Sequence, residues 1–272
     1  MTTNLAVLGS PITHSKSPAL HAAAYRELGL DWAYTAIEVT GADLREFVTS
    51  RDASWRGLSL TMPLKREVLP LLTDVDELVE LTGGANTVLL DDGLRGFNTD
   101  VYGITEAFRA NGVASLGRVQ ILGGGATAAS ALAAVAALGA THAQFALRDP
   151  QKSAVLDRLG ASLGIEVEVR GFGVVGDMPD AVISTLPGRT DHDQTFAPEL
   201  RGHAVLFDVA YDPWPSALAA QWSEVGGRVI SGLQMLTLQA LAQVRIFVGG
   251  SANAELENEP AVLAAMQRAV TP

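Results

Sequence analysis

Apolar runs typical of strands alternate with amphipathic segments typical of helices from the first residues of the chain. This alternation predicts repeated β-α units. The predicted elements of the first part are strands over residues 5–8, 34–39 and 58–61 and helices over residues 18–28, 43–49 and 63–72.

A hairpin interrupts this series. Apolar segments at residues 87–90 and 94–97 flank Asp91-Asp92-Gly93, a sequence that favours a tight turn between antiparallel strands. A helix is predicted to follow as far as Ala110 and to end at Asn111-Gly112, where the first unit gives way to the second.

A second β-α series then begins, with helices between its strands. Its predicted strands cover residues 119–122, 144–147, 167–170, 181–186, 205–209 and 228–230. Two more helices, over residues 233–248 and 260–270, follow without a third sheet and are expected to pack on the first unit. The pattern predicts two α/β units with mostly parallel sheets, joined near residues 101–112.

Composition narrows the possible functions. The 272 residues include 48% apolar and 18% charged residues, as in a compact α/β protein. The net charge of −11 gives no support to nucleic-acid binding, and the absence of cysteine excludes disulfides and thiolate metal sites. Five scattered histidines do not suggest a metal site either. With no signal-like or membrane-spanning run, we expect a soluble, cytoplasmic protein.

A glycine-rich turn is the clearest binding signal. Gly123, Gly124, Gly125 and Ala126 begin a G-x-G-x-x-A sequence that directly follows one predicted strand and opens an alanine-rich helix. In that context, backbone amides and a helix N-terminus would face a pyrophosphate, as in dinucleotide-binding units. The alternative is a flexible glycine turn without a ligand.

The end of the next strand bears on the choice of cofactor. Arg148 and Lys152 would suit the 2′-phosphate of NADP. Asp149 could instead accept a hydrogen bond from the bare ribose of NAD, or it could cap the following helix. The sequence therefore favours NADP, with NAD as the alternative.

Three polar segments of the first half are each placed after or beside a predicted strand: residues 11–18, residues 60–65, and residues 86–87 with 98–100. Ligands of open α/β sheets bind beyond the carboxyl ends of strands, so these loops are expected to converge on one crevice. For Ser17, which precedes Pro18, an ordinary N-cap is an equally good interpretation.

In these segments the chain resembles the shikimate dehydrogenases, a family that reduces 3-dehydroshikimate at the expense of NADPH. The resemblance spans nearly the whole chain. Its matching segments are residues 9–12 with 14–18, 61–65, 84–87, 98–100 with Gly103, the glycine-rich turn, 208–213, and 232–236 with Gln239 and Ala240.

The resemblance implies a role for each matching residue. Lys65 and Asp100 would be the catalytic pair, and Glu77 is a weaker candidate. The substrate carboxylate would be bound by Ser15 and Ser17. The carboxylate and hydroxyls would also be held by Thr61, Asn86, Tyr211 and Gln239. Val209 and Gly232 would lie against the nicotinamide, with Gly123, Gly124, Gly125, Ala126, Arg148 and Lys152 along the rest of the cofactor.

The assigned chemistry needs such a pair. Hydride addition to a ketone leaves negative charge on oxygen, so a proton donor is required in reduction and a base in oxidation. Lys65 can serve as both, and Asp100 is expected to tether it. The alternatives are an ordinary surface lysine at position 65 and, at Asp100, a helix N-cap, which would be compatible with the catalytic role. Three positions depart from the family pattern, because Ser59, Ala22 and Leu147 stand where asparagine is usual.

The resulting expectation is a two-domain α/β enzyme. Residues 1–102, completed by residues 238–272, would bind substrate, and residues 103–237 would form a Rossmann-type NADP domain. The expected reaction is the reversible reduction of 3-dehydroshikimate to shikimate in aromatic amino-acid biosynthesis, by a monomer or homodimer without nucleic-acid or membrane partners. The alternatives are an NAD-preferring quinate and shikimate dehydrogenase, or a regulatory protein that senses a ligand without turnover.

Overall fold

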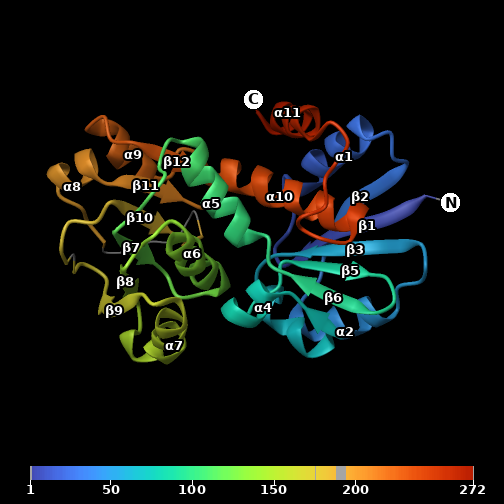
Figure 1. Cartoon of the computed structure of the whole chain (residues 1–272), viewed down its shortest axis with the longest axis horizontal. Helices are drawn as coiled ribbons and strands as arrows, with labels where there is room; N and C mark the ends of the chain where they lie inside the picture. Colours follow the sequence, from blue (N-terminus) through green and yellow to red (C-terminus); the bar gives the residue numbers. More distant parts are fainter. Residues whose placement is uncertain (1, 175, 188–193, 272) are drawn as a thin grey trace. The chain divides into compact units, whose positions relative to one another are not determined.

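The structure, a computed structural model, describes residues 2–174, 176–187 and 194–271 (Figure 1). The chain divides into two compact units, one made of Met1–Gly103 with Leu236–Pro272 and the other of Ile104–Met235. Both boundaries fall inside helices, α5 (Asp100–Ala110) and α10 (Gly232–Gly249). None of the helices within the described ranges is long and apolar enough to span a bilayer.

The first unit is built on a six-stranded sheet with the strand order β2-β1-β3-β5-β6-β4. β1 runs parallel to β2 and β3, whereas β5 is antiparallel to β3 and β6. β5 and β6 form the hairpin that the turn at residues 91–93 predicted. The strands are β1 (Thr3–Gly9), β2 (Trp32–Glu38), β3 (Trp55–Leu60), β4 (Asp74–Val75), β5 (Thr87–Leu90) and β6 (Leu94–Phe97).

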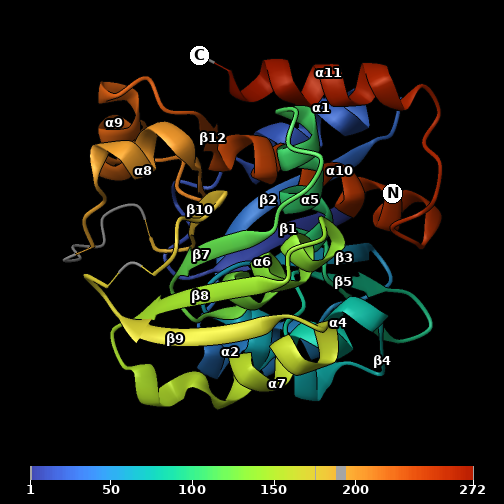
Figure 2. The same cartoon turned by 60° about the vertical axis from the view of Figure 1, so that its left-hand side comes forward.

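Helices cover both faces of this sheet. Figures 1 and 2 show α1 (Ser17–Glu27) and α11 (Glu259–Val270) on one side, with α2 (Gly41–Thr49) and α4 (Glu77–Thr82) on the other. The amphipathic pattern of α2 directs Leu44 and Val48 into the core. That core also contains Leu8, Leu58, Leu60, Leu64 and Val88.

The helix predicted over residues 63–72 is wrong in length. The structure has a short helix, α3 (Leu64–Glu67), and then a 3₁₀ turn, η1 (Leu69–Leu71). Pro70 explains the break, because proline has no N–H to donate and its ring clashes with the carbonyl four residues earlier. Helix α4 was not predicted, although Asp76 caps it by accepting from the Val79 N–H at 2.7 Å and Gly83 ends it with a left-handed φ of 65°.

The second unit has an all-parallel six-stranded sheet in the order β12-β11-β10-β7-β8-β9. This is the strand order of a Rossmann fold, whose direction of winding reverses between β7 and β10. The strands are β7 (Arg118–Leu122), β8 (His142–Leu147), β9 (Glu166–Gly171), β10 (Ala181–Ser184), β11 (Val205–Asp208) and β12 (Val229–Ser231). The helices are α6 (Ala126–Ala137), η2 (Pro150–Ser153), α7 (Ala154–Leu163), α8 (Pro198–His203) and α9 (Ala217–Glu224).

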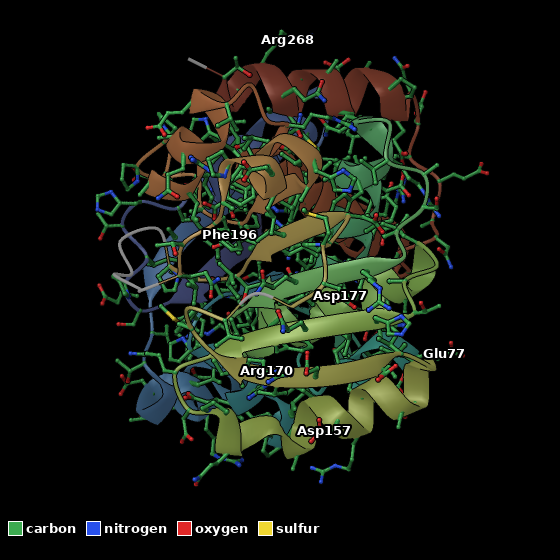
Figure 3. The ribbon with its side chains drawn as sticks, turned by 90° about the vertical axis from the view of Figure 1, so that its left-hand side faces the viewer. Glu77, Asp157, Arg170, Asp177, Phe196 and Arg268 are labelled. Atoms are coloured by element: carbon green, nitrogen blue, oxygen red, sulfur yellow. The ribbon has the colours of Figure 1, made fainter. Side chains whose placement is uncertain are left out.

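In the second unit, the exposure of a helix or strand depends on whether it lies in the centre or at the edge of the unit. α6 is buried at every residue from Ala128 to Val135, which explains why it is rich in alanine rather than amphipathic. β9 lies at one edge of the sheet and alternates exposed with half-buried residues. Figure 3 shows Arg170 on this strand and Asp157 on the neighbouring α7. Charged side chains on an edge strand discourage pairing with another chain.

Candidate active site

Lys65 and Asp100 form an ion pair in the first unit. Lys65 lies in α3, and Asp100 is the first residue of α5. The Lys65 Nζ atom donates to Asp100 Oδ2 at 2.5 Å, and the two side chains are 15% and 5% exposed. Water therefore screens the pair only weakly. The structure brings together the two residues that the resemblance pairs, and Lys65 is not an ordinary surface lysine.

The second carboxylate oxygen of Asp100 is held by Asn86. The Asn86 Nδ2 atom donates to Asp100 Oδ1 at 2.8 Å, and Asn98 Oδ1 accepts from the Asp100 backbone N–H at 3.0 Å. Asn86 and Asp100 are both buried. The carboxylate of Asp100 therefore points at Lys65 and Asn86, and Asp100 is the first residue of α5.

Gln239 joins this cluster from α10. Its Oε1 atom lies 3.2 Å from both Asn86 Nδ2 and Thr99 Oγ1, and its Nε2 atom donates to the Leu236 carbonyl at 2.9 Å. Thr99 in turn donates its backbone N–H to Asn86 Oδ1 at 2.9 Å. Polar groups from four separate segments thus meet: Lys65 in α3, Asn86 just before β5, Thr99 and Asp100 after β6, and Gln239 within α10.

Ser15 lies in the loop that follows β1 and leads to Ser17, and Thr61 directly follows β3, the neighbour of β1 in the sheet. Ser15 Oγ accepts from the Ser17 N–H at 3.3 Å. Ser17 is the first residue of α1 and Lys16 holds the capping position, so the N-cap interpretation of Ser17 is wrong. Thr61 is tied to β1, because its N–H donates to the Leu8 carbonyl at 2.9 Å.

The contact between these two loops depends on a residue without a side chain. A Cβ atom at Gly9 would lie 2.4 Å from Thr61 Cγ2, so only glycine permits this approach. Ser10, the next residue, donates its N–H to the Met62 carbonyl at 3.1 Å. The weaker candidate, Glu77, is exposed in the first turn of α4 and has no hydrogen bond or ion pair with the Lys65 cluster among the described residues (Figure 3).

A buried polar network behind Asn86 was not predicted from the sequence. It contains Tyr25, His21, Gln243, Ser59 and Tyr34. Burial lowers the pKa of His21 to about 3, against a smaller opposing effect of its hydrogen bond to Gln243, and burial raises the pKa of Tyr34. One signal was available, since Gln243 follows Gln239 by one helical turn on a mostly apolar helix.

In the second unit, the glycine-rich turn has the geometry of an anion site. Gly123 has a φ of 103°, and a Cβ atom there would lie 2.7 Å from Thr185 Oγ1. At Gly124 a Cβ atom would lie 2.9 Å from Leu147 Cδ2, whereas at Gly125 it would meet open space. No side chain caps α6, which begins at Ala126, so its first N–H groups lie beside that open space and suit a phosphate.

Residues after β8 were predicted to select the cofactor. Arg148 is exposed directly after the strand. Asp149 occupies the N-cap of η2, where its Oδ1 atom accepts from the Gln151 N–H at 3.2 Å. Of the two roles considered for Asp149, the structure shows the capping one. The side chain of Lys152 lies outside the described part of the chain.

Val209 and Gly232, both expected at the nicotinamide end, lie against each other. A Cβ atom at Gly232 would be 2.0 Å from the Val209 carbonyl oxygen, so this position excludes any side chain. Buried Asp208 shapes the segment that follows, because its carboxylate accepts from the Ala210 N–H at 3.1 Å and from the Ser216 hydroxyl at 2.5 Å.

Tyr211 lies in the second unit, unlike the other predicted substrate residues. Burial raises the pKa of its phenol, and the neighbouring Asp212 carboxylate adds to the effect, so the hydroxyl is protonated at neutral pH. Neither unit offers a metal site in its described portion, where histidine and carboxylate side chains form no cluster of three or more.

Comparison with known proteins is consistent with this geometry. Residues 7–88 match the model of the shikimate dehydrogenase substrate binding domain. Over 251 residues, the chain is 35% identical to shikimate dehydrogenase (NADP(+)) of Methanothrix thermoacetophila, with 90% of this chain and 91% of that protein covered.

Solved structures show the same similarity over the full length. The crystal structure of Mycobacterium tuberculosis shikimate dehydrogenase is 38% identical, with a TM-score of 0.84 and coverage of 98% of this chain and 99% of that one. The Thermus thermophilus enzyme in complex with shikimate is 28% identical, with a TM-score of 0.81 and coverage of 98% and 99%.

These proteins share the two-part architecture, an N-terminal α/β substrate domain and a Rossmann-type NADP-binding domain. The identity to the Methanothrix enzyme extends across nine-tenths of the chain, far beyond the segment matched by the substrate-domain model. The chain belongs to the shikimate dehydrogenase family.

Proposed function

We propose that this protein catalyses the reversible NADP-dependent reduction of 3-dehydroshikimate to shikimate in aromatic amino-acid biosynthesis. The observation that carries the proposal is the weakly screened ion pair of Lys65 and Asp100, held on its far side by Asn86. It is the acid-base group that reduction of a ketone to an alcohol requires.

Lys65 supplies the proton in this proposal. As negative charge develops on the carbonyl oxygen, the Lys65 ammonium stabilises it and transfers a proton to it. In the oxidative direction, neutral Lys65 accepts the hydroxyl proton. Asp100 Oδ2 orients Nζ throughout, while Asn86 keeps the carboxylate from rotating.

The remaining predicted residues hold the substrate. We assign the carboxylate to the hydroxyls of Ser15, in the loop after β1, and Ser17, at the start of α1. Thr61, Asn86 and Gln239 would bind the carboxylate and ring hydroxyls from the first unit. Tyr211 would also bind the substrate through its neutral hydroxyl.

The second unit fits NADP. The N–H groups at Gly124, Gly125 and Ala126 would bind the pyrophosphate, because no side chain fills the space at Gly125. Arg148 and Lys152 would pair with the 2′-phosphate, and Val209 and Gly232 would border the nicotinamide. When bound, this cofactor supplies the hydride.

No feature of the described residues favours the alternatives. The capping bond of Asp149 gives that residue a role other than binding a bare NAD ribose, and the intact Lys65 and Asp100 pair is not needed by a protein that only senses ligands. We therefore retain NADP as the cofactor and turnover as the function.

The finer organisation is proposed on the same basis. We assign substrate binding to residues 1–102 completed by residues 238–272, and cofactor binding to residues 103–237. We further propose a cytoplasmic monomer or homodimer without nucleic-acid or membrane partners, in keeping with the net charge of −11.

The test is an assay of nicotinamide reduction with each of the four pairs of shikimate or quinate with NADP+ or NAD+. We expect the largest kcat/KM for shikimate with NADP+. A preference for quinate with NAD+ would replace the proposal with its dehydrogenase alternative. Absence of turnover with all four pairs would refute the proposed enzyme activity.

A further inference from the structure

Gln243 lies behind Asn86 and contacts it without reaching Lys65 or Asp100. Its side chain is buried, and its Nε2 atom donates to the Asn86 backbone carbonyl at 3.1 Å and to Thr87 Oγ1 at 3.0 Å. Its Oε1 atom accepts from Ser59 Oγ at 2.9 Å and lies 3.2 Å from His21 Nε2. The Gln243 amide therefore makes two hydrogen bonds through its nitrogen and two through its oxygen, which satisfies the whole group.

The donor and the acceptor of each hydrogen bond in this network can be assigned from the groups involved. The Asn86 carbonyl can only accept, so the Gln243 amide must present nitrogen to it and oxygen to His21. His21 must therefore donate from Nε2 and accept at Nδ1, where Tyr25 Oη lies at 3.1 Å. Thr87 Oγ1 accepts a hydrogen bond from Gln243 Nε2 and donates one to Asn86 Oδ1 at 2.9 Å.

At its other end, this series of hydrogen bonds meets the Asn86 amide and supports the orientation that the Thr99 N–H also requires. Its Oδ1 atom accepts from Thr87 Oγ1 and from the Thr99 N–H, which can only donate. The Nδ2 atom must then face Asp100 Oδ1, which leaves Oδ2 for Lys65. A directed series of hydrogen bonds thus runs from His21 to the carboxylate beside the proposed proton donor.

We propose that His21 and Gln243 are positioning residues, whose directed hydrogen bonds hold the Asn86 amide so that Asp100 keeps Lys65 in place for proton transfer. The inference rests on the proposed function. It adds two residues that touch none of the reacting groups and act only through Thr87 and Asn86.

Packing holds His21 in the required form. Its ring is fully buried and stacks on Tyr34, with centroids 3.9 Å apart and planes 4° apart. Burial lowers its pKa to about 3, so the ring is neutral at physiological pH and retains one donor and one acceptor nitrogen. A charged ring would donate from both nitrogens and would oppose the bond from Tyr25.

The test compares two substitutions that remove the same ring. His21→Gln and His21→Leu both abolish the stack on Tyr34, but only glutamine retains an amide donor at the distance of Nε2. Tyr34→Phe is the matched control, because it deletes a buried bond to Ser59 while leaving the path from His21 to Asn86. Thermal unfolding of each variant separates lost stability from lost function.

We expect His21→Leu to lower kcat for shikimate oxidation roughly ten-fold, with KM for NADP+ unchanged, because small misplacements of catalytic groups are costly. His21→Gln should stay within about two-fold of wild type despite a similar loss in Tm, and Tyr34→Phe should likewise keep its kcat. Equal kcat losses for His21→Gln and His21→Leu, or the same loss in Tyr34→Phe, would overturn the proposal.

Two further measurements test the proposal independently of the His21 variants. Gln243→Met, which keeps the volume and removes every bond of the amide, should repeat the kcat loss, and the His21 variants decide the question if it does not fold. Nitrogen NMR of histidine-labelled wild-type protein should show a neutral His21 protonated at Nε2, and an Nδ1–H or charged ring would refute the directed chain. A wild type that shows this tautomer but no shikimate turnover would contradict the proposed function alone.

Discussion

The proposed catalytic site around Asp100 is organised by hydrogen bonds between side chains, whereas the proposed phosphate site at residues 123–125 is formed by backbone N–H groups. In the first unit, each oxygen of the Asp100 carboxylate has its own donor, Lys65 or Asn86. In the second unit, the start of α6 has no side-chain cap, and a Cβ atom at Gly125 would meet open space.

The difference follows from what each unit is proposed to bind. Proton transfer needs one amine held at one position. Buried hydrogen bonds can hold it there without a large desolvation penalty when every polar group has a partner. A pyrophosphate spreads its charge over several oxygens, which several backbone N–H groups can meet if no side chain intervenes. Substitutions should therefore act on chemistry in one unit and on binding or folding in the other.

The largest effect is expected at the ion pair. Lys65→Ala should lower kcat by about 10³-fold, since it removes the proposed proton donor, with cofactor affinity nearly unchanged. Steady-state kinetics and NADP+ titration by fluorescence would measure both. Arg66→Ala, an exposed neighbour in the same short helix, is the control and should retain full activity. If Lys65→Ala kept wild-type kcat, the first unit would not supply the acid-base group.

The next effect tests the backbone side of the comparison. Gly125→Ser should fold normally, because a Cβ atom there meets nothing within 4 Å, but its side chain would occupy the proposed phosphate space. We expect NADP+ affinity to fall by about 100-fold, measured by calorimetry, with Tm unchanged. Gly202→Ser, another open glycine, should alter neither quantity. Undiminished affinity in Gly125→Ser would place the pyrophosphate elsewhere.

Arg148→Ala should have a smaller and selective effect. Loss of the proposed contact to the 2′-phosphate should weaken NADP+ binding roughly ten-fold and leave NAD+ binding unchanged, since charged hydrogen bonds contribute about 1.5–3 kcal/mol. Arg158→Ala removes an equally exposed arginine from α7 and serves as the control. Equal losses for the two cofactors would contradict the phosphate assignment.

The smallest effect concerns stability alone. Asp76→Ala removes the cap of α4 and should lower the free energy of unfolding by about 1 kcal/mol in urea titrations. Glu80→Ala, an exposed carboxylate on the same helix, should change it by less than about 0.5 kcal/mol. A large loss of kcat in Asp76→Ala would mean that this cap also supports the Lys65 cluster.

The local sequence was sufficient wherever a signal and its structural result lie close together. The hairpin at residues 91–93, the end of α5 before Gly112 and the strand, turn and helix around Gly123 all form as predicted. Turn chemistry and hydrophobic period act over a few residues, so they can be read in one pass along the chain. The breaks at Pro70 and Gly83 were equally local and could have been found in the same way.

Other features depend on partners that only the tertiary structure supplies. The sequence named Lys65, Asp100, Asn86 and Gln239, but nothing local shows which oxygen each nitrogen meets. Gln243 reaches the Asn86 carbonyl across 157 positions of sequence, and His21 meets Gln243 across 222. The strength and direction of a buried hydrogen bond depend on both partners and on their shared burial, which folding decides.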